Sequence, residues 1–151
     1  MPISKREEQE FITVEKMTTG FQTGIKATLL ITKKKGMSDE DFEQHYTNVH
    51  IPMATEIMNR HRVLYYGVQF ITGENKENVQ ALFGGAIGSI DCDAVVTAIF
   101  SDMDSLKATF ADPEFSTKLS PDGKIFTEDD GRMVIGKEFV GVWNKAKPVS
   151  V

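Results

Sequence analysis

The order in which strand-like and helix-like patterns alternate along this chain constrains its fold more than any other feature. Residues 26–33 are rich in β-branched and aliphatic side chains and stop at Gly36, which predicts a strand followed by a turn. Ser38 then precedes three acidic residues, a good N-cap for an amphipathic helix. Residues 63–71 alternate with period two, as a second strand does. A strand–helix–strand unit is therefore predicted for the first half.

The second half repeats this order after a long connection. The predicted elements are a loop with at most a short helix (73–90), a strand (94–100), a helix (102–111), a short helical piece (113–119), a turn (120–123) and a strand (133–143). This is the split βαβ arrangement of ferredoxin-like domains, an α+β fold with a four-stranded antiparallel sheet. The sheet face without helices must be solvated, covered by a partner or hollowed into a ligand site, which favours a homodimer.

Length and composition favour one globular domain. The chain has 151 residues, 40% hydrophobic and 26% charged, as ordinary globular proteins do. Residues 1–24 are predicted to form an N-terminal arm and residues 25–147 the domain. The net charge of -5 provides no basic field for nucleic acid. The sequence therefore predicts no nucleic-acid partner.

Cellular location and metal chemistry are also constrained. The first twenty residues lack the apolar core of a signal peptide, and no apolar stretch approaches the length of a membrane helix, so we expect a cytoplasmic protein with no membrane partner. Cys92 is the only cysteine, which rules out an internal disulfide and a cysteine-based zinc cage within one chain. The adjacent residues 91–93 alternate sides and cannot easily share one ion. No metal site and no cofactor are predicted.

The helix that follows Ser38 carries the most informative cluster of polar residues. Pro52 removes a backbone donor and pushes Ile51 away from helical angles, so the pattern predicts a kink or restart with His50 at the break. Tyr46 and His50 lie four residues apart on one face, whereas His45 is about 100° around the helix from Tyr46. Because histidine exchanges protons near neutral pH, His50 and Tyr46 are the candidate catalytic residues. The alternative is that His50 only caps the broken helix by bonding a free carbonyl.

Aromatic residues of the strands form a second candidate group. Tyr65 and Gln69 alternate with Tyr66 on the second strand and therefore belong to opposite faces, and Phe100 lies on the third strand. These residues either line a pocket or simply pack in the core. The candidate substrate-binding residues are Phe42, His45, Tyr65, Tyr66, Gln69 and Phe100. His61 ends its helix beside two arginines and is interpreted as structural.

Several motifs resemble a known family. They are KKKGMSDEDF at 33–42, HY at 45–46, VHIP at 49–52, DCDAVV at 91–96, FADPEF at 110–115, KIF at 124–126 and VIGKE at 134–138. Together they resemble the EthD-domain pattern of the dimeric α+β barrel superfamily over about residues 26–145. The segments DPEF and KIF are similar to those of small fungal enzymes of polyketide gene clusters.

The resemblance implies a homodimer with a pocket between sheet and helices, and a histidine matching His50 at its polar end. Several of the similar fungal enzymes are cofactor-free decarboxylases of anthrone-type carboxylic acids, and other relatives are dehydratases, cyclases, isomerases or accessory proteins. A histidine often found near the end of the second strand has no counterpart at residues 69–72, where the sequence reads QFIT.

The expected activity is decarboxylation of an aromatic polyketide acid, a small-molecule substrate. An apolar pocket desolvates the carboxylate, and His50 acts as general acid/base with Tyr46 in support. The alternatives are cyclisation, dehydration or isomerisation in the same pocket, or a ligand-binding dimer without chemistry.

Overall fold

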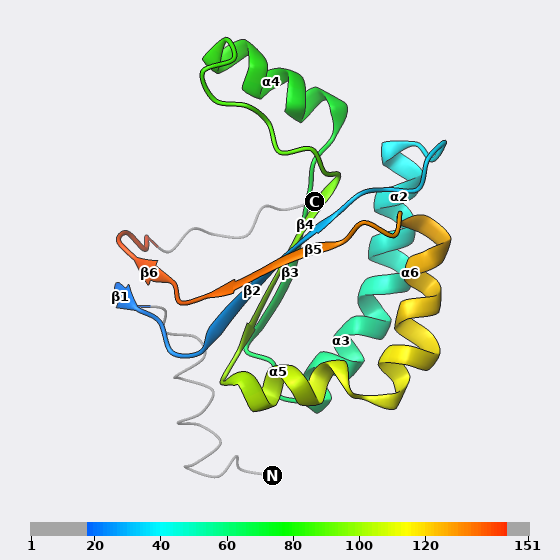
Figure 1. Ribbon diagram of the computed structural model, residues 1–151, viewed down its shortest axis with the longest axis vertical. Coiled ribbons are helices and arrows are strands. Elements are labelled where there is room, and N and C mark those ends of the chain that lie inside the picture. Colours follow the sequence, from blue (N-terminus) through cyan, green and yellow to red (C-terminus); the bar gives the residue numbers. More distant parts are fainter. Residues whose placement is uncertain (1–17, 145–151) are drawn as a thin grey trace.

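A four-stranded antiparallel sheet forms one layer of the structure, a computed structural model that describes residues 18–144 (Figure 1). Its strands are β2 (Ile25–Ile31), β3 (Tyr65–Phe70), β4 (Ala94–Phe100) and β5 (Arg132–Gly136), in the spatial order β3-β4-β2-β5. Each strand pairs antiparallel with its neighbours. The predicted α+β class and the four-stranded antiparallel sheet are confirmed.

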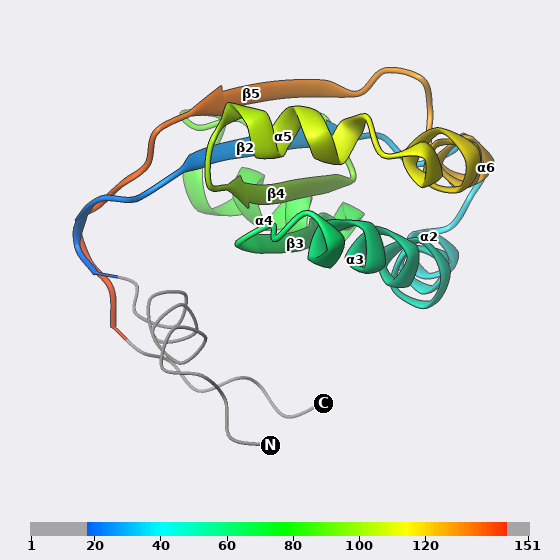
Figure 2. The ribbon, with the colours of Figure 1, turned by 90° about the horizontal axis from the view of Figure 1, so that it is seen from below.

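Helices form the second layer, on one side of the sheet (Figure 2). The first half contributes α2 (Asp39–His45), the π-helical turn η1 (Tyr46–His50) and α3 (Ile51–Arg60). The second half contributes α5 (Met103–Phe110), the π-helical turn η2 (Phe115–Leu119) and α6 (Ser120–Phe126). Within residues 18–144, no helix is long and apolar enough to cross a membrane.

The core lies between these two layers. Alternate residues of β4, from Ala94 to Phe100, are buried against the helices because successive side chains of a strand point to opposite faces. Phe42 of α2 and Phe126 of α6 pack on them from the helical layer. Burial of each of these phenylalanines contributes about 1.5–3 kcal/mol to folding. This packing ties α2 and α6 to the same end of the sheet.

The predicted restart at Pro52 is confirmed in part, since Pro52 lies in the first turn of a second segment, α3, whereas the predicted loss of helical angles at Ile51 is wrong. Ile51 has helical angles (φ −59°, ψ −43°), and its N–H donates to the carbonyl oxygen of Tyr46, five residues earlier. A π-helical turn of this kind is wider than an α-helical one and contains an extra residue. Pro52 lies in the first turn of α3, where proline fits because its missing N–H is not needed. The helix therefore continues from Asp39 to Arg60 with a widened turn instead of a break.

The predicted turn at residues 120–123 is also wrong. Pro121 lies in the first turn of α6, and η2 directly precedes this helix, just as η1 precedes α3. A proline with fixed φ is pre-organised for a helix start as well as for a turn. This segment carries Asp122, so its helical conformation matters for the site.

The connection between β3 and β4 contains a longer helix than predicted. Helix α4 (Gly73–Phe83) has 11 residues, and a capping box between Thr72 and Asn75 begins it. Gly84 ends it in the left-handed conformation, with φ of 57°. None of its residues is buried, and it projects away from the rest of the molecule (Figure 1).

The predicted last strand, 133–143, is divided in two. β5 ends at Gly136, and β6 (Phe139–Val140) pairs with β1 (Gly20–Phe21) in a separate two-stranded sheet. Part of the predicted arm thus contacts the end of the domain. Residues 1–17 and 145–147 lie outside the described residues, and the division into arm and domain stays a prediction.

Candidate active site

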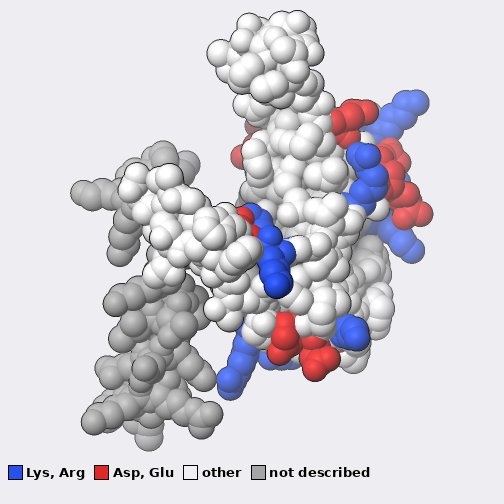
Figure 3. Space-filling model, turned by 60° about the vertical axis from the view of Figure 1, so that its left-hand side comes forward, with Lys and Arg blue, Asp and Glu red and all other residues white. Residues whose placement is uncertain are grey.

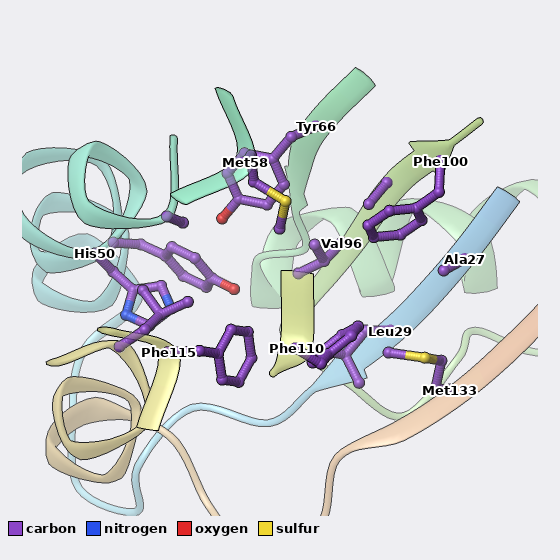
Figure 4. Close-up of a pocket in the computed structure, with 14 residues that line it drawn as sticks. Ala27, Leu29, His50, Met58, Tyr66, Val96, Phe100, Phe110, Phe115 and Met133 are labelled. Carbon is purple, nitrogen blue, oxygen red and sulfur yellow. The ribbon is translucent and has the colours of Figure 1, made fainter. Parts of the chain in front are cut away.

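A cavity of about 90 Å³ lies between the sheet and the helices. Its walls come from all four strands of the main sheet and from η1, α3, α5 and η2. Figure 4 shows His50 at one end and Phe100, Ala27 and Met133 toward the other. Among residues 18–144, none that lines the cavity is Lys, Arg, Asp or Glu, and the polar side chains of the lining are those of His50, Tyr46 and Tyr66. The cavity is thus an apolar space with a small polar end.

His50 is oriented by a buried carboxylate. Its Nδ1 lies 2.8 Å from Oδ2 of Asp122, which is 8% exposed. An ionised carboxylate only accepts hydrogen bonds, so the bonding network assigns the proton to Nδ1. Nε2 then carries the lone pair, and within residues 18–144 it has no hydrogen-bond partner. The imidazole therefore presents a basic nitrogen at the cavity.

His45 donates to the other oxygen of the same carboxylate. Its Nε2 lies 3.0 Å from Oδ1 of Asp122. We call His45, Asp122 and His50 the carboxylate clamp. In a regular α-helix, residues five apart are about 140° out of register and could not both reach one group. The π-helical turn, with its bond from residue i+5 to residue i, brings both histidines to one side of the helix.

Two tyrosines line the cavity together with His50. The ring of Tyr46 meets the His50 ring edge-on, with centroids 5.2 Å apart. Burial raises the pKa of Tyr46, and the neighbouring Tyr66 adds to the effect. Burial also raises the pKa of Tyr66, to about 12. Both phenols are therefore neutral at physiological pH and can donate a hydrogen bond to a ligand.

The environment favours the neutral form of His50. Burial lowers its pKa, and the hydrogen bond and charge of Asp122 act in the opposite direction. Because lowering is the net result, the imidazole is uncharged near neutral pH and can accept a proton. When it does so, Asp122 stabilises the imidazolium. A histidine in this state is suited to act as a general base.

The structure brings only some of the predicted site residues together. His50, Tyr46, Tyr66 and Phe100 line the cavity. Phe42 does not line it and packs in the core against Tyr46, with ring centroids 5.5 Å apart.

The other three predicted substrate-binding residues lie outside the cavity. His45 lies behind the cavity wall, on Asp122. Tyr65 and Gln69 are exposed on the opposite face of β3, as strand alternation requires.

Asp122 was not among the residues predicted from the sequence. The signal that could have found it is Ser120-Pro121-Asp122, since serine, proline and an acid in this order are typical of a helix start. His61, interpreted as structural, makes a similar bond elsewhere, with its Nε2 2.7 Å from Oδ2 of Asp112. That pair joins the ends of α3 and α5 and does not line the cavity.

The fold and cavity define a ferredoxin-like α+β protein with a buried histidine–carboxylate pair. The EthD domain model matches residues 34–130, about two thirds of the chain. The chain therefore belongs to the EthD-domain family, which confirms the resemblance of its motifs.

Relatives and a solved structure agree with this assignment. Dehydratase aurZ of Gibberella zeae is 27% identical over 122 residues, 78% of this chain and 80% of that protein. Decarboxylase claH of Passalora fulva is 28% identical over 117 residues, 75% of this chain and 76% of that protein. An EthD family protein of Bacillus halodurans superposes with a TM-score of 0.55 at 19% identity, over 78% of this chain and all of that one.

Proposed function

We propose that this chain is a lyase that tailors polyketides in secondary metabolism and that its reaction is the dehydration of a β-hydroxy carbonyl compound. The observation that carries the proposal is the neutral His50, oriented by Asp122 at 2.8 Å and facing an apolar cavity beside two tyrosine hydroxyls. Relatives named dehydratases, such as aurZ and the conidial pigment biosynthesis dehydratase of Metarhizium robertsii, support it.

The proposed reaction begins with proton abstraction. Nε2 of His50 takes a proton from the carbon next to the substrate carbonyl, and the hydroxyl of Tyr46 or Tyr66 donates to the carbonyl oxygen, where charge develops. The C–O bond at the next carbon then breaks, a C=C bond forms, and the imidazolium returns the proton to the departing hydroxide as water. Asp122 is a positioning residue that stabilises the imidazolium. General base catalysis of this kind contributes roughly 10²- to 10⁴-fold.

Decarboxylation is the second candidate, favoured because the cavity wall contains no Lys or Arg in the part of the chain that the structure describes. An ionised carboxylate placed there loses its hydration without a counter-charge, and losing carbon dioxide moves the charge onto a keto oxygen that a tyrosine can bind. Two relatives at 28% identity are named decarboxylases. We place this reaction second because it requires His50 to be protonated at the start, whereas burial lowers its pKa and favours the neutral form.

The size of the cavity supports a substrate that extends beyond it. Pockets for drug-sized ligands usually measure about 300–1,000 Å³, whereas this cavity has about 90 Å³. Two lining residues, Phe110 and Met133, are also 37% and 39% exposed. Ile135 pairs with Ala27 of the cavity wall, so it shares this face of the sheet, and it is 47% exposed. We propose that the reacting ring enters the cavity and that further apolar rings lie over these three side chains.

We further propose that the open face of the sheet pairs with a second copy of the chain. Thr97 and Ile99 of β4 and the exposed Tyr65 of β3 lie on this face. Beyond one end of the sheet, residues 79–90 contain no charged side chain, and this lobe is white at the top of Figure 3. Exposed apolar side chains gather in this lobe, as is typical of protein contacts: Leu82, Phe83, Ile87 and Ile90. A cytoplasmic location stays a prediction.

Product analysis tests the reaction. Purified protein is incubated separately with an aromatic β-hydroxy ketone and with an anthrone carboxylic acid, and the products are weighed by mass spectrometry. Loss of water from the first substrate supports dehydration, whereas loss of carbon dioxide from the second supports the alternative. His50→Ala should lower kcat about 10²-fold or more, because the acid–base group is gone.

His61→Ala is the matched control. It removes a partly buried histidine that also bonds an aspartate but does not line the cavity. We expect its kcat to match the wild type. Full turnover by His50→Ala would contradict the proposed role of His50, and the absence of any product from either class of substrate would contradict the proposed lyase activity.

A further inference from the structure

The second histidine of the carboxylate clamp has no place in the proposed reaction. His45 does not line the cavity, yet it donates a hydrogen bond to Asp122 in the structure. We infer that His45 is a positioning residue that weakens the proton affinity of His50 by sharing the carboxylate of Asp122. This inference deepens the proposed function and rests on His50 acting as its base.

The geometry divides one carboxylate between two donors. Oδ1 of Asp122 accepts from His45 at 3.0 Å, and Oδ2 accepts from His50 at 2.8 Å. The side chain of Asp122 is 10% exposed, so water competes little for either oxygen. Each donor draws negative charge toward its own oxygen. The charge that remains to stabilise a proton on His50 is therefore smaller than an unshared carboxylate would provide.

The titratable groups around His50 come from three elements. Asp122 belongs to α6, His45 and Tyr46 to the helix of His50 itself, and Tyr66 to β3 on the other side of the cavity. Asp122 raises the pKa of His50, whereas burial and the nearby His45 lower it. The two tyrosines are neutral near physiological pH because burial raises the pKa of each. Among these neighbours, His45 is the side chain that can offset the rise in the pKa of His50 caused by Asp122.

Packing also fixes the position of His45. Its ring lies against Phe126, with centroids 4.6 Å apart, and Phe126 is fully buried. Phe126 also contacts the His50 ring, at 5.0 Å. Both imidazoles thus rest on one side chain of α6, the helix that carries Asp122. Replacing His45 by phenylalanine keeps this stacking and removes only the donor.

The test measures His50 directly and needs no substrate. The imidazole of His50 is titrated by NMR in the wild type and in His45→Phe, His45→Gln and His61→Phe. His45→Phe should move the His50 titration to higher pH, because Asp122 then acts on His50 alone. His45→Gln retains an N–H donor and should titrate like the wild type. His61→Phe removes a similar histidine–aspartate bond away from the cavity and should also leave His50 unchanged.

Each outcome either supports or overturns the inference about His45. A His50 titration in His45→Phe that stays at or below the wild-type pH overturns the inference, and so does a shift in His45→Gln as large as in His45→Phe. If His45→Phe does not fold, His45→Leu replaces it with the same expectation. In an active enzyme, the acidic limb of the kcat/KM profile should move to higher pH with the titration, whereas a merely structural role would lower activity equally at every pH.

The titration also separates this inference from the proposed function. If the His50 titration shifts in a protein that turns over neither class of substrate, the role of His45 is supported and the proposed lyase activity is contradicted. If the titration does not shift in an active lyase, the proposed activity is supported and the role of His45 is contradicted.

Discussion

Replacing Asp122 by asparagine is the change that most directly tests the proposed base. Asparagine keeps the size of the side chain but offers one oxygen and one NH₂ group where the carboxylate offers two oxygens. The two imidazoles both donate to residue 122 in the wild type. One of them must therefore lose its bond or change tautomer. If His50 changes tautomer, its Nε2 carries the proton and cannot accept another.

The expected loss of kcat in Asp122→Asn follows from the hydrogen bond that is lost. A hydrogen bond to a charged group contributes about 1.5–3 kcal/mol. Losing this stabilisation of the His50 imidazolium alone lowers kcat by about 10- to 150-fold, at about 1.36 kcal/mol per tenfold change. A reversed tautomer costs more, since the corresponding aspartate-to-asparagine change in the catalytic triad of a serine protease lowers kcat by about 10⁴-fold. We therefore expect Asp122→Asn to lose between about 10- and 10⁴-fold in kcat.

The pH profile of kcat/KM should shift in a direction that structural damage would not produce. Because Asp122 raises the pKa of His50, its removal lets burial lower that pKa further. His50 then stays neutral to a lower pH, so the acidic limb of kcat/KM should move to lower pH while the plateau falls. His45→Phe should move the same limb in the opposite direction.

The assay is steady-state turnover across pH, with circular dichroism to confirm folding. Asp112→Asn is the matched control, because Asp112 is also buried and bonded to a histidine but lies outside the cavity wall. Its kcat should equal that of the wild type. A folded Asp122→Asn protein with wild-type kcat would refute the assignment of His50 as a base oriented by Asp122.

Two further predictions concern the cavity and its mouth. Ala98→Leu should fill the cavity and abolish ligand binding in calorimetric titration. Thermal denaturation should show a stability that is retained or raised by at most about 2 kcal/mol, because filling 90 Å³ contributes about 24 cal/mol per Å³. Ligand binding at wild-type affinity would show that the cavity is not the site. Ile135→Lys should raise KM about tenfold with kcat unchanged, because it removes apolar contact at the mouth. Ile125→Lys, at an exposed isoleucine of α6 outside the cavity wall, should leave KM unchanged, and equal effects of the two lysines would contradict the proposed mouth.

Periodicity predicted the strands and helices that have a buried face, because burial imposes a readable pattern. Alternation in β4 places its buried residues as expected. Helix α4 has no buried residue, and its caps rather than an apolar stripe define it, so its length could not be read from periodicity. The sequence did not predict the end of β5. β5 and β6 follow each other closely in the chain, and what separates them is that β5 pairs with β2 and β6 with β1, which a pattern along the chain does not reveal.

The site was less predictable than the fold because it depends on one backbone turn. The sequence indicated His50 and Tyr46 from their spacing of four, which suits a regular helix. It could not indicate that His45 and His50 share a carboxylate, because residues five apart lie on different sides of a regular helix and only the π-helical turn brings them together. Asp122 stayed hidden because Ser-Pro-Asp-Gly is equally typical of a turn and of a helix start.

The widened turn at residues 46–50 also bears on how relatives of this chain are compared. A π-helical turn is equivalent to a one-residue insertion in an α-helix, so a relative without it needs a gap at this point of an alignment. In such a relative, a histidine aligned with His50 would not imply a second histidine on the same carboxylate. In this chain the clamp comes from two histidines five residues apart, followed by Ile-Pro, and from a Pro-Asp pair whose aspartate lies 72 residues beyond the second histidine. We expect a relative that keeps the two histidines at this spacing, together with the Pro-Asp pair, to build the same carboxylate clamp.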